Sequence, residues 1–378
     1  AFHVSKLLSK PVHLNFPFRE PLYKTELKPS KSGKKITHFK TNKSIGKDQL
    51  AILKKKWRKH NKKMIVCGSL QKNSTLNNIL KEFNNDPSVC VLTETTSNLH
   101  DEKFISSIDR TLERLNDNPS FFPEIVITIG NSIISKKLKK LLRKNKPQEH
   151  WHIEETNRAQ DIFSSLTHFI PINPEEFLKE FLDDYLSNKK SDFSNIWSLE
   201  FNKSEENHFQ YLSTCKWSDL KAHELIQKQL DGKKVNLQMG NSTSVRYVQL
   251  FQQQKEIKYN SNRGVSGIDG SSSTAIGAAS VSNELTVLIT GDLSFIYDQH
   301  ALWNNEVPKN LKIIVVNNQG GGIFNIISGP KTTPYSKEFF ETSHEISLEK
   351  IAATFKINYQ KASNERQAVE YLNNSFSS

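Results

Sequence analysis

The stretch "IIVVNNQGGGIFNII", Ile313 to Ile327, bears on both the fold and the site. It opens as a run of β-branched residues typical of a buried parallel strand, and within one step it becomes polar and rich in glycine. A second stretch, "TVLITGD", ends in a similar way at Asp292. Strands alternate with helices from Lys63 onward, so the sequence predicts an α/β protein with two doubly wound parallel sheets.

The order of the predicted elements divides the chain into two α/β domains. A helix with Asn173 as its cap and Pro174 at its first position closes the first domain. A polar stretch, "SDFSNIWSLEFNKSEENHF", separates it from the second. Residues 1–23 look like the tail of a larger domain, and no strand follows the last predicted helix, "NERQAVEYLNNSF". We therefore expect the chain to be cut at both ends. The predicted divisions are a tail of a preceding domain with a short strand (1–23), a basic linker and first helix (24–63), a middle domain (64–190) and a second domain (191–378).

The net charge of +12 has a local source. Residues 24–63 hold 15 Lys or Arg against two acids, a net of +13, so the rest of the chain sums to about −1. We interpret this segment as a solvated linker and helix face. A basic module that binds RNA or an anionic membrane stays open as a non-enzyme alternative, although RNP-like aromatics and zinc-knuckle spacing are missing. The three cysteines occur singly, which indicates reduced thiols in a cytoplasmic protein.

Polar residues follow two strands that are consecutive in the predicted second sheet. Asp292 and Asn318 are 26 residues apart, about the length of a loop, a helix and a parallel return. Their oxygens, with a backbone carbonyl freed at Gly320, are hard ligands suited to Mg²⁺. One carboxylate supplies only one negative charge, so a diphosphate is implied, with backbone N–H groups near Gly291 and Gly320 approaching it. Turn and cap roles are the alternative for such residues.

These residues resemble a known family. "GDLS" followed by "VVNNQGG" is similar to the signature of thiamine-diphosphate-dependent enzymes. This resemblance implies that Asp292, Asn318 and the Gly320 carbonyl bind Mg²⁺ or Mn²⁺ beside thiamine diphosphate. "NRGVSGIDG", "GDLSFIYD" and "NNQGGGIF" together resemble the 2-succinyl-5-enolpyruvyl-6-hydroxy-3-cyclohexene-1-carboxylate synthase family of menaquinone biosynthesis, most strongly in residues 235–327. "PVHLNFPFREPLY" resembles the end of that family's first domain.

The resemblance implies a transferase that decarboxylates 2-oxoglutarate and adds the resulting succinyl-semialdehyde carbanion to isochorismate. It also implies a cytoplasmic homodimer or homotetramer whose active site forms between two subunits. The implied substrate contacts are Ser242, Arg246, Arg263, Lys136, Ile323 and Phe324. The implied cofactor contacts are Ile268, Gly291, Asp292, Leu293, Ser294 and Asn318. Lys136 stands in a run with Lys137, Lys139 and Lys140, so a neighbouring lysine stays open for that role. His344 follows a family-like pattern, but we assign it no role.

One departure from the family concerns catalysis. The family's pyrimidine-binding domain carries a glutamate that activates the cofactor, and that domain would precede Ala1; Glu20 and Glu26 lie too late in the matching region to replace it. We therefore assign no catalytic residue within this chain and expect it to be nearly inactive alone. An acetolactate-synthase-like or 2-oxoacid decarboxylase activity on pyruvate is the enzymatic alternative, but Arg246 and Arg263 suit a dicarboxylate and isochorismate better. A nicotinamide-binding domain is a weaker alternative because no G-x-G-x-x-G follows a strand.

Overall fold

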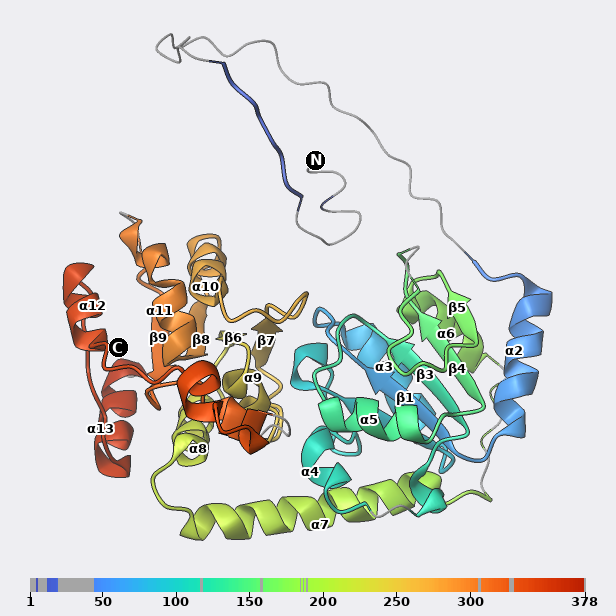
Figure 1. Cartoon of the computed structure of the whole chain (residues 1–378). Helices are drawn as coiled ribbons and strands as arrows, with labels where there is room; N and C mark the ends of the chain where they lie inside the picture. The colour runs from blue at the N-terminus through green and yellow to red at the C-terminus, as the bar shows by residue number, and fades with distance from the viewer. Residues whose placement is uncertain are drawn as a thin grey trace.

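Two parallel sheets with helices around them make up the structure (Figure 1). This computed structural model describes residues 5, 12–19, 44–115, 118–156, 159–183, 185, 187, 190–304, 307–325 and 330–376. The predicted α/β class with two doubly wound sheets is confirmed. The predictions on residues 20–43 and on Ile326 and Ile327 fall outside the described residues. Residues 20–43 include Glu20, Glu26 and most of the basic linker.

The first sheet has five parallel strands in the order β2-β1-β3-β4-β5. Their bounds are β1 Lys63–Cys67, β2 Val89–Thr93, β3 Ile125–Ile129, β4 Glu149–Ile153 and β5 His168–Ile170. Strands β1, β2 and β3 are buried along their whole length, which explains their continuous apolar sequences. The three-residue β5 was not predicted because it is too short to show a period.

Helices cover both faces of this sheet. Their bounds are α2 Lys47–Lys59, α3 Ser74–Asn84, α4 Ile108–Leu112, α5 Lys136–Lys144 and α6 Pro174–Leu182. The predicted cap of α6 is confirmed, since Asn173 Oδ1 accepts the N–H of Glu175 at 2.9 Å. The sequence pattern predicts a helix near residues 102–115, and within that range the structure has only the shorter α4. The physical reason is that Ile105 forms a bridge with Leu92 of β2, which keeps the chain before α4 extended.

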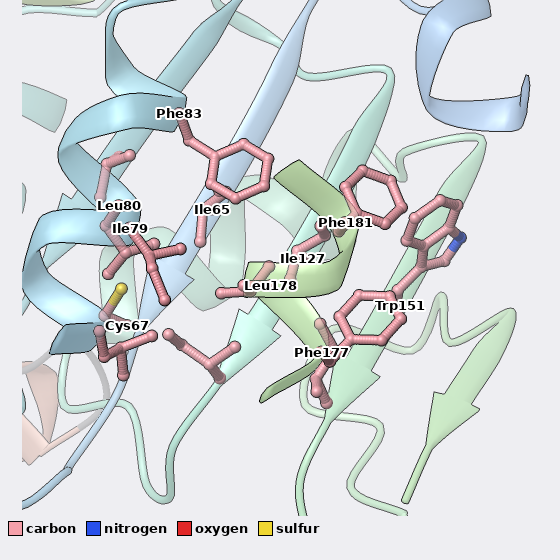
Figure 2. Packing of buried hydrophobic residues seen from close by; sticks show 14 of the residues in the cluster. Ile65, Cys67, Ile79, Leu80, Phe83, Ile127, Trp151, Phe177, Leu178 and Phe181 are labelled. Carbon is pink, nitrogen blue, oxygen red and sulfur yellow. The ribbon is translucent and has the colours of Figure 1, made fainter. Parts of the chain in front are cut away.

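An aromatic and aliphatic core fills one face of the first sheet (Figure 2). Ile65 and Ile127 contribute from the strands, and Phe83 from α3 and Phe181 from α6 pack over them. Trp57 joins this core from α2, with its ring centroid 6.1 Å from that of Trp151. The basic helix α2 therefore uses its apolar side for packing, while most of its lysines stay at the surface.

The stretch expected to be a polar separator is a 22-residue helix, α7 Phe193–Thr214. Phe193, Trp197 and Phe201 recur every four residues on one side of it and are buried against the first domain. Figure 1 shows α7 running beneath both sheets. On this helix, Glu205 Oε2 accepts a hydrogen bond from Gln252 Nε2 of the second domain at 3.3 Å. The prediction missed this helix because the many polar residues between the aromatic ones hide the period.

The second sheet has four parallel strands in the order β7-β6-β8-β9. The strands are β6 Val235–Met239, β7 Ile257–Ser261, β8 Leu285–Gly291 and β9 Leu311–Val316. The helices are α8 Asp219–Leu230, α9 Thr243–Val248, α10 Ser271–Ser280, α11 Asp292–Tyr297, α12 Leu348–Thr354 and α13 Glu365–Phe376. The strand order changes direction between β6 and β8. Their carboxyl ends therefore flank a topological switch point, the usual place for a ligand in such sheets.

Two further observations bear on the ends and the surface of the chain. Residues 12–19 form no strand, so the short strand predicted there is wrong for these residues, which have no paired neighbour in the structure. Within the described ranges, no helix is both long and apolar enough to cross a membrane.

Candidate active site

Asp292 lies at the switch point. It follows β8 directly, begins α11 and is only 2% exposed. Its Oδ1 accepts the N–H of Leu293 at 2.7 Å, and its Oδ2 accepts the N–H of Gly320 at 2.9 Å. His344 Nε2 lies 3.2 Å from the same Oδ2. The chain segments that follow β8 and β9 thus meet at one buried carboxylate, and His344, to which the sequence analysis assigned no role, meets it too.

The two asparagines after β9 have different roles. Asn317 Oδ1 accepts the N–H of Gln319 at 3.0 Å and so forms the turn. Asn318 Nδ2 donates to Asp219 Oδ2 at 3.0 Å, and its Oδ1 accepts no hydrogen bond from any described residue. Gly320 follows at a close approach, because a Cβ there would lie 2.7 Å from the carbonyl oxygen of Glu341. Only glycine fits at this position.

These donors fit a metal ion of one particular kind. No group of three His, Cys, Asp or Glu side chains that could hold a metal exists in the part of the chain that the structure describes. An ion at this edge would therefore have one carboxylate, from Asp292, with the free amide oxygen of Asn318 and backbone oxygen near Gly320. That set suits a hard dication that completes its shell with water and phosphate oxygens. A cavity of about 540 Å³, lined in part by Asn318, Gly320 and His344, opens beside these residues.

The predicted cofactor contacts lie around this carboxylate. Ser294 Oγ donates to the carbonyl oxygen of Ile268, which ties α11 to the loop before α10. Leu293 and Gly291 are half-buried next to Asp292. The structure therefore gathers all five of these residues at the carboxyl end of β8.

Asn241, to which the sequence analysis gave no role, organises the neighbouring loop. It is 2% exposed, and its Nδ2 donates to the carbonyl oxygens of Asn262 (2.7 Å) and Gly267 (2.6 Å). Its Oδ1 accepts from Arg263 Nη1 at 2.7 Å. The available signal was its place two residues after β6, at the same edge of the sheet as Asp292.

Backbone strain marks the same region. Ser242, at the start of α9, has φ 71° and ψ −119°, and Ser266 and Gln319 also have positive φ angles of 61° and 63°. Such angles are uncommon for residues other than glycine, and strained residues gather at binding and catalytic sites. All three positions lie in loops that follow strands of the second sheet, which supports a functional role for this edge.

Arg246 and Arg263 lie at this edge on α9 and on the loop after β7. Both side chains are half-buried, and the Nε of each is buried with no hydrogen-bond partner among the described residues. Burial, and then the charge of Arg246, lower the pKa of Arg263. A buried N–H without a partner is costly, and two neighbouring cations repel each other. An anion bound between them would relieve both costs.

The other predicted substrate contacts are more scattered. Lys136 is exposed at the start of α5, and the neighbouring Lys137 pairs with Glu113. Ile323 and Phe324 are half-buried in a single 3₁₀ turn, η4 Gly322–Asn325, which follows the glycine-rich loop. The structure thus places the last two near the cavity and Lys136 at the surface.

Glu94 is a second buried carboxylate, and the sequence analysis missed it. It follows β2, is 1% exposed, and accepts the N–H groups of Ile134 (2.6 Å) and Ser135 (2.7 Å) at the start of α5. Burial raises its pKa to about 7; Asp109 also raises it, while the two backbone hydrogen bonds and Lys139 act against the rise. The sequence feature that could have indicated Glu94 is the one that indicated Asp292: an acidic residue directly after a buried strand.

This pKa predicts a pH-dependent stability. The pKa of Glu94 is higher in the folded protein than in the unfolded chain, so the folded protein binds this proton more tightly. Binding of the proton therefore stabilises the fold fully below pH 4.5, and this stabilisation is lost as pH rises through 7. The loss is about 3 kcal/mol in the free energy of unfolding. We expect Glu94→Gln to remove this dependence between pH 4.5 and 8. Urea titrations of both proteins across that range test it, and a difference between them that is constant with pH would contradict it.

Comparisons with known proteins support the cofactor chemistry. Residues 238–377 match the family model described as "Thiamine pyrophosphate enzyme, C-terminal TPP binding domain", thiamine pyrophosphate being another name for thiamine diphosphate. The matched segment begins in β6 and runs through α13, so it contains Asp292, Asn318 and Gly320.

Curated relatives match nearly the whole chain. A protein from Flavobacterium psychrophilum named 2-succinyl-5-enolpyruvyl-6-hydroxy-3-cyclohexene-1-carboxylate synthase is 43% identical over 375 residues, which cover 98% of this chain and 67% of the relative. A protein of the same name from Flavobacterium johnsoniae is 41% identical, and the match covers 96% of this chain and 65% of the relative. Another from Christiangramia forsetii is 38% identical, and the match covers 97% of this chain and 64% of the relative. The chain thus spans about two thirds of the length of the curated relatives it matches. It belongs to the 2-succinyl-5-enolpyruvyl-6-hydroxy-3-cyclohexene-1-carboxylate synthase family of thiamine-diphosphate-dependent enzymes.

Proposed function

We propose that this protein, at the full length of its relatives, decarboxylates 2-oxoglutarate and joins the remaining four-carbon unit to isochorismate in menaquinone biosynthesis. The observation that carries this proposal is the pair of half-buried arginines, Arg246 and Arg263, at the same strand-end edge as Asp292. Both substrates carry carboxylates, and guanidinium groups bind carboxylates through paired hydrogen bonds. The name of the F. psychrophilum relative agrees with this reaction.

Each residue has a defined part in this proposal. Thiamine diphosphate, when bound, supplies the electron sink for decarboxylation. Asp292, Asn318 and the Gly320 carbonyl would hold Mg²⁺, or Mn²⁺ in its place, and such an ion would supply positive charge beside the diphosphate. Asn241 fixes Arg263 through the 2.7 Å hydrogen bond, so the guanidinium is already oriented when an acid arrives.

The remaining contacts shape the cavity. Ile268, whose carbonyl oxygen accepts from Ser294, would contact the cofactor through its apolar side chain. Ile323 and Phe324 exclude water from the reacting carbon, and Ser242 and Lys136 complete the substrate contacts. We also infer that the protein works in the cytoplasm as a homodimer or homotetramer, with residues from a second subunit completing the site, and that this chain alone is nearly inactive.

The pyruvate-decarboxylating alternative makes a different demand on the arginines. Pyruvate carries one carboxylate and a methyl group, so a second buried guanidinium would have no anion to bind. The two Nε groups, which have no partner in the part of the chain that the structure describes, therefore favour substrates with more than one acid group.

Removing one arginine is expected to weaken substrate binding. In the protein extended to the length of its relatives, Arg263→Gln should raise the KM for one of the two acids about 10- to 100-fold, because a hydrogen bond to a charged group contributes about 1.5–3 kcal/mol. Arg366→Gln, at an exposed position on α13, is the matched control. Steady-state kinetics with each acid varied in turn measure the change. Unchanged KM values for both acids would reject Arg263 as a substrate contact.

A further inference from the structure

The amide of Asn318 can serve a metal ion only if its oxygen, and not its nitrogen, faces that ion. The two arms of a side-chain amide are nearly equal in size, so a specific hydrogen bond has to choose between them. Asn318 Nδ2 donates to Asp219 Oδ2 at 3.0 Å, across 99 positions of sequence. Because an ionised carboxylate accepts and cannot donate, this contact requires the nitrogen arm and leaves Oδ1 as the free arm.

Gly322 makes room for the same amide nitrogen. A Cβ at this position would lie 2.8 Å from Asn318 Nδ2 and 3.8 Å from Asn318 Oδ1. A side chain on residue 322 would therefore displace the nitrogen arm from Asp219 before it reached the oxygen. Asn318 and Gly322 both line the cavity of about 540 Å³ beside Gly320. The loop and Asp219 thus both constrain the nitrogen arm of one amide at the edge of this cavity.

The start of helix α8 holds Asp219 in place. Ser218 caps this helix, and His223 Nδ1 donates to the carbonyl oxygen of Asp219 at 2.7 Å. His223 is 1% exposed and stacks on Tyr247 of α9, with the two ring centroids 4.8 Å apart. Tyr247 directly follows Arg246 in the sequence. The helix start that contacts Asn318 is therefore also packed against the helix that carries one of the two arginines.

A helix-capping role does not account for the partner of Asp219. An acid in the first turn of a helix is favoured by the helix dipole, which explains the residue type. Among the residues that the structure describes, however, the Asp219 carboxylate forms no ion pair, and Asn318 is the one side chain that donates to it. A hydrogen bond from an amide nitrogen to a charged acceptor polarises the amide, so its oxygen becomes a better ligand for a hard cation.

We propose that Asp219 is a positioning residue for the metal site, which turns the amide of Asn318 so that Oδ1 faces the ion. It acts through Asn318 and is not itself a ligand. The proposal rests on the proposed function, and it deepens it by adding a residue of α8 to a site otherwise built from the strand ends. Loss of a residue behind a metal ligand commonly lowers metal affinity about 10- to 100-fold.

The test uses the protein at the length of its relatives and needs no turnover. Electron paramagnetic resonance measures the binding of Mn²⁺ in the presence of thiamine diphosphate, and calorimetry measures the binding of thiamine diphosphate at fixed Mg²⁺. Asp219→Ala should weaken both about tenfold. Asp219→Asn should recover most of the loss, because its amide oxygen can accept the same hydrogen bond. Asp231→Ala, at the opposite end of α8, is the matched control and should bind both like the parent protein.

A double-mutant cycle separates positioning from a general loss of structure. Asn318→Ala has no amide to orient but keeps the Asp292 carboxylate, so its remaining Mn²⁺ affinity can be measured. Adding Asp219→Ala to it should change that affinity by less than about twofold. If the two losses multiply instead, Asp219 acts independently of Asn318 and the proposal is wrong.

The other outcomes separate this proposal from the proposed function. If Asp219→Ala binds Mn²⁺ and the cofactor as tightly as the parent protein, the proposal fails while the proposed function stands. If the unsubstituted protein does not bind thiamine diphosphate with Mg²⁺, the proposed function fails first. An Asp219→Ala variant that melts below the parent protein is judged through Asp219→Asn. If that variant melts like the parent and still binds as weakly as Asp219→Ala, the proposal is overturned.

Discussion

Asp292→Ala is expected to weaken the binding of thiamine diphosphate with Mg²⁺ by about 100-fold or more. Asp292 is the one carboxylate in the predicted ligand set, and removing one partner of a buried charge pair costs about 3–5 kcal/mol, with each 1.4 kcal/mol equal to a tenfold change in affinity. The substitution also leaves the N–H groups of Leu293 and Gly320 without an acceptor. Isothermal titration of the cofactor in the presence of Mg²⁺ measures the loss.

Asp292→Asn separates the charge from the packing. The amide has the same size and keeps one oxygen acceptor, so this variant should fold with a melting temperature near that of the parent protein and still lose most of the affinity. Asp231→Ala, at an exposed position after α8, is the control and should bind normally. If both Asp292 variants bind the cofactor as tightly as the parent protein, the metal site lies elsewhere.

Trp151→Ala is expected to lower the free energy of unfolding by about 3–5 kcal/mol, the usual range for a buried tryptophan. Trp151 is fully buried in β4, near Phe181 of α6 (Figure 2). The ring centroids of Trp57 and Phe181 each lie 6.1 Å from its own. The loss therefore combines the apolar area of the indole, a cavity, and two aromatic contacts. Urea unfolding followed by circular dichroism gives the value.

Trp303→Ala provides the comparison for this measurement. Trp303 is 78% exposed, and surface substitutions of this kind change stability by less than about 0.5 kcal/mol. Trp151→Phe should fall between the two, because a phenyl ring fills part of the space. Equal effects for Trp151→Ala and Trp303→Ala would show that the core around β4 is not packed as described.

Much of the fold could be predicted because its signals are local. Strands β8 and β9 are short apolar runs that end in polar residues, and the parallel-sheet rule places their ends at one edge without any knowledge of tertiary contacts. The cap at Asn173 is equally local. Helix α7 has a local signal too, its aromatic residues every four positions, but polar residues between them conceal it.

The rest of the site depends on contacts between distant residues. Glu94 and Ile134 are 40 residues apart, and Ser132 and Arg263 are 131 apart. Neither pair carries a sequence period, so nothing in the first domain's sequence shows that the loop before α5 meets the loop that carries Arg263. Asn318 is similar, since its hydrogen bond to Asp219 joins residues 99 positions apart. Sequence patterns locate the strand ends, whereas the packing of α5 against the second domain selects the residues that meet there.

The most direct test of the proposed function follows the loss of 2-oxoglutarate with and without isochorismate. It uses the protein at the full length of its relatives, with thiamine diphosphate and Mg²⁺, beside the Asp292→Ala variant. We predict consumption that depends on isochorismate and disappears in the variant. Turnover of pyruvate in place of 2-oxoglutarate, or consumption that persists in Asp292→Ala, would contradict the account.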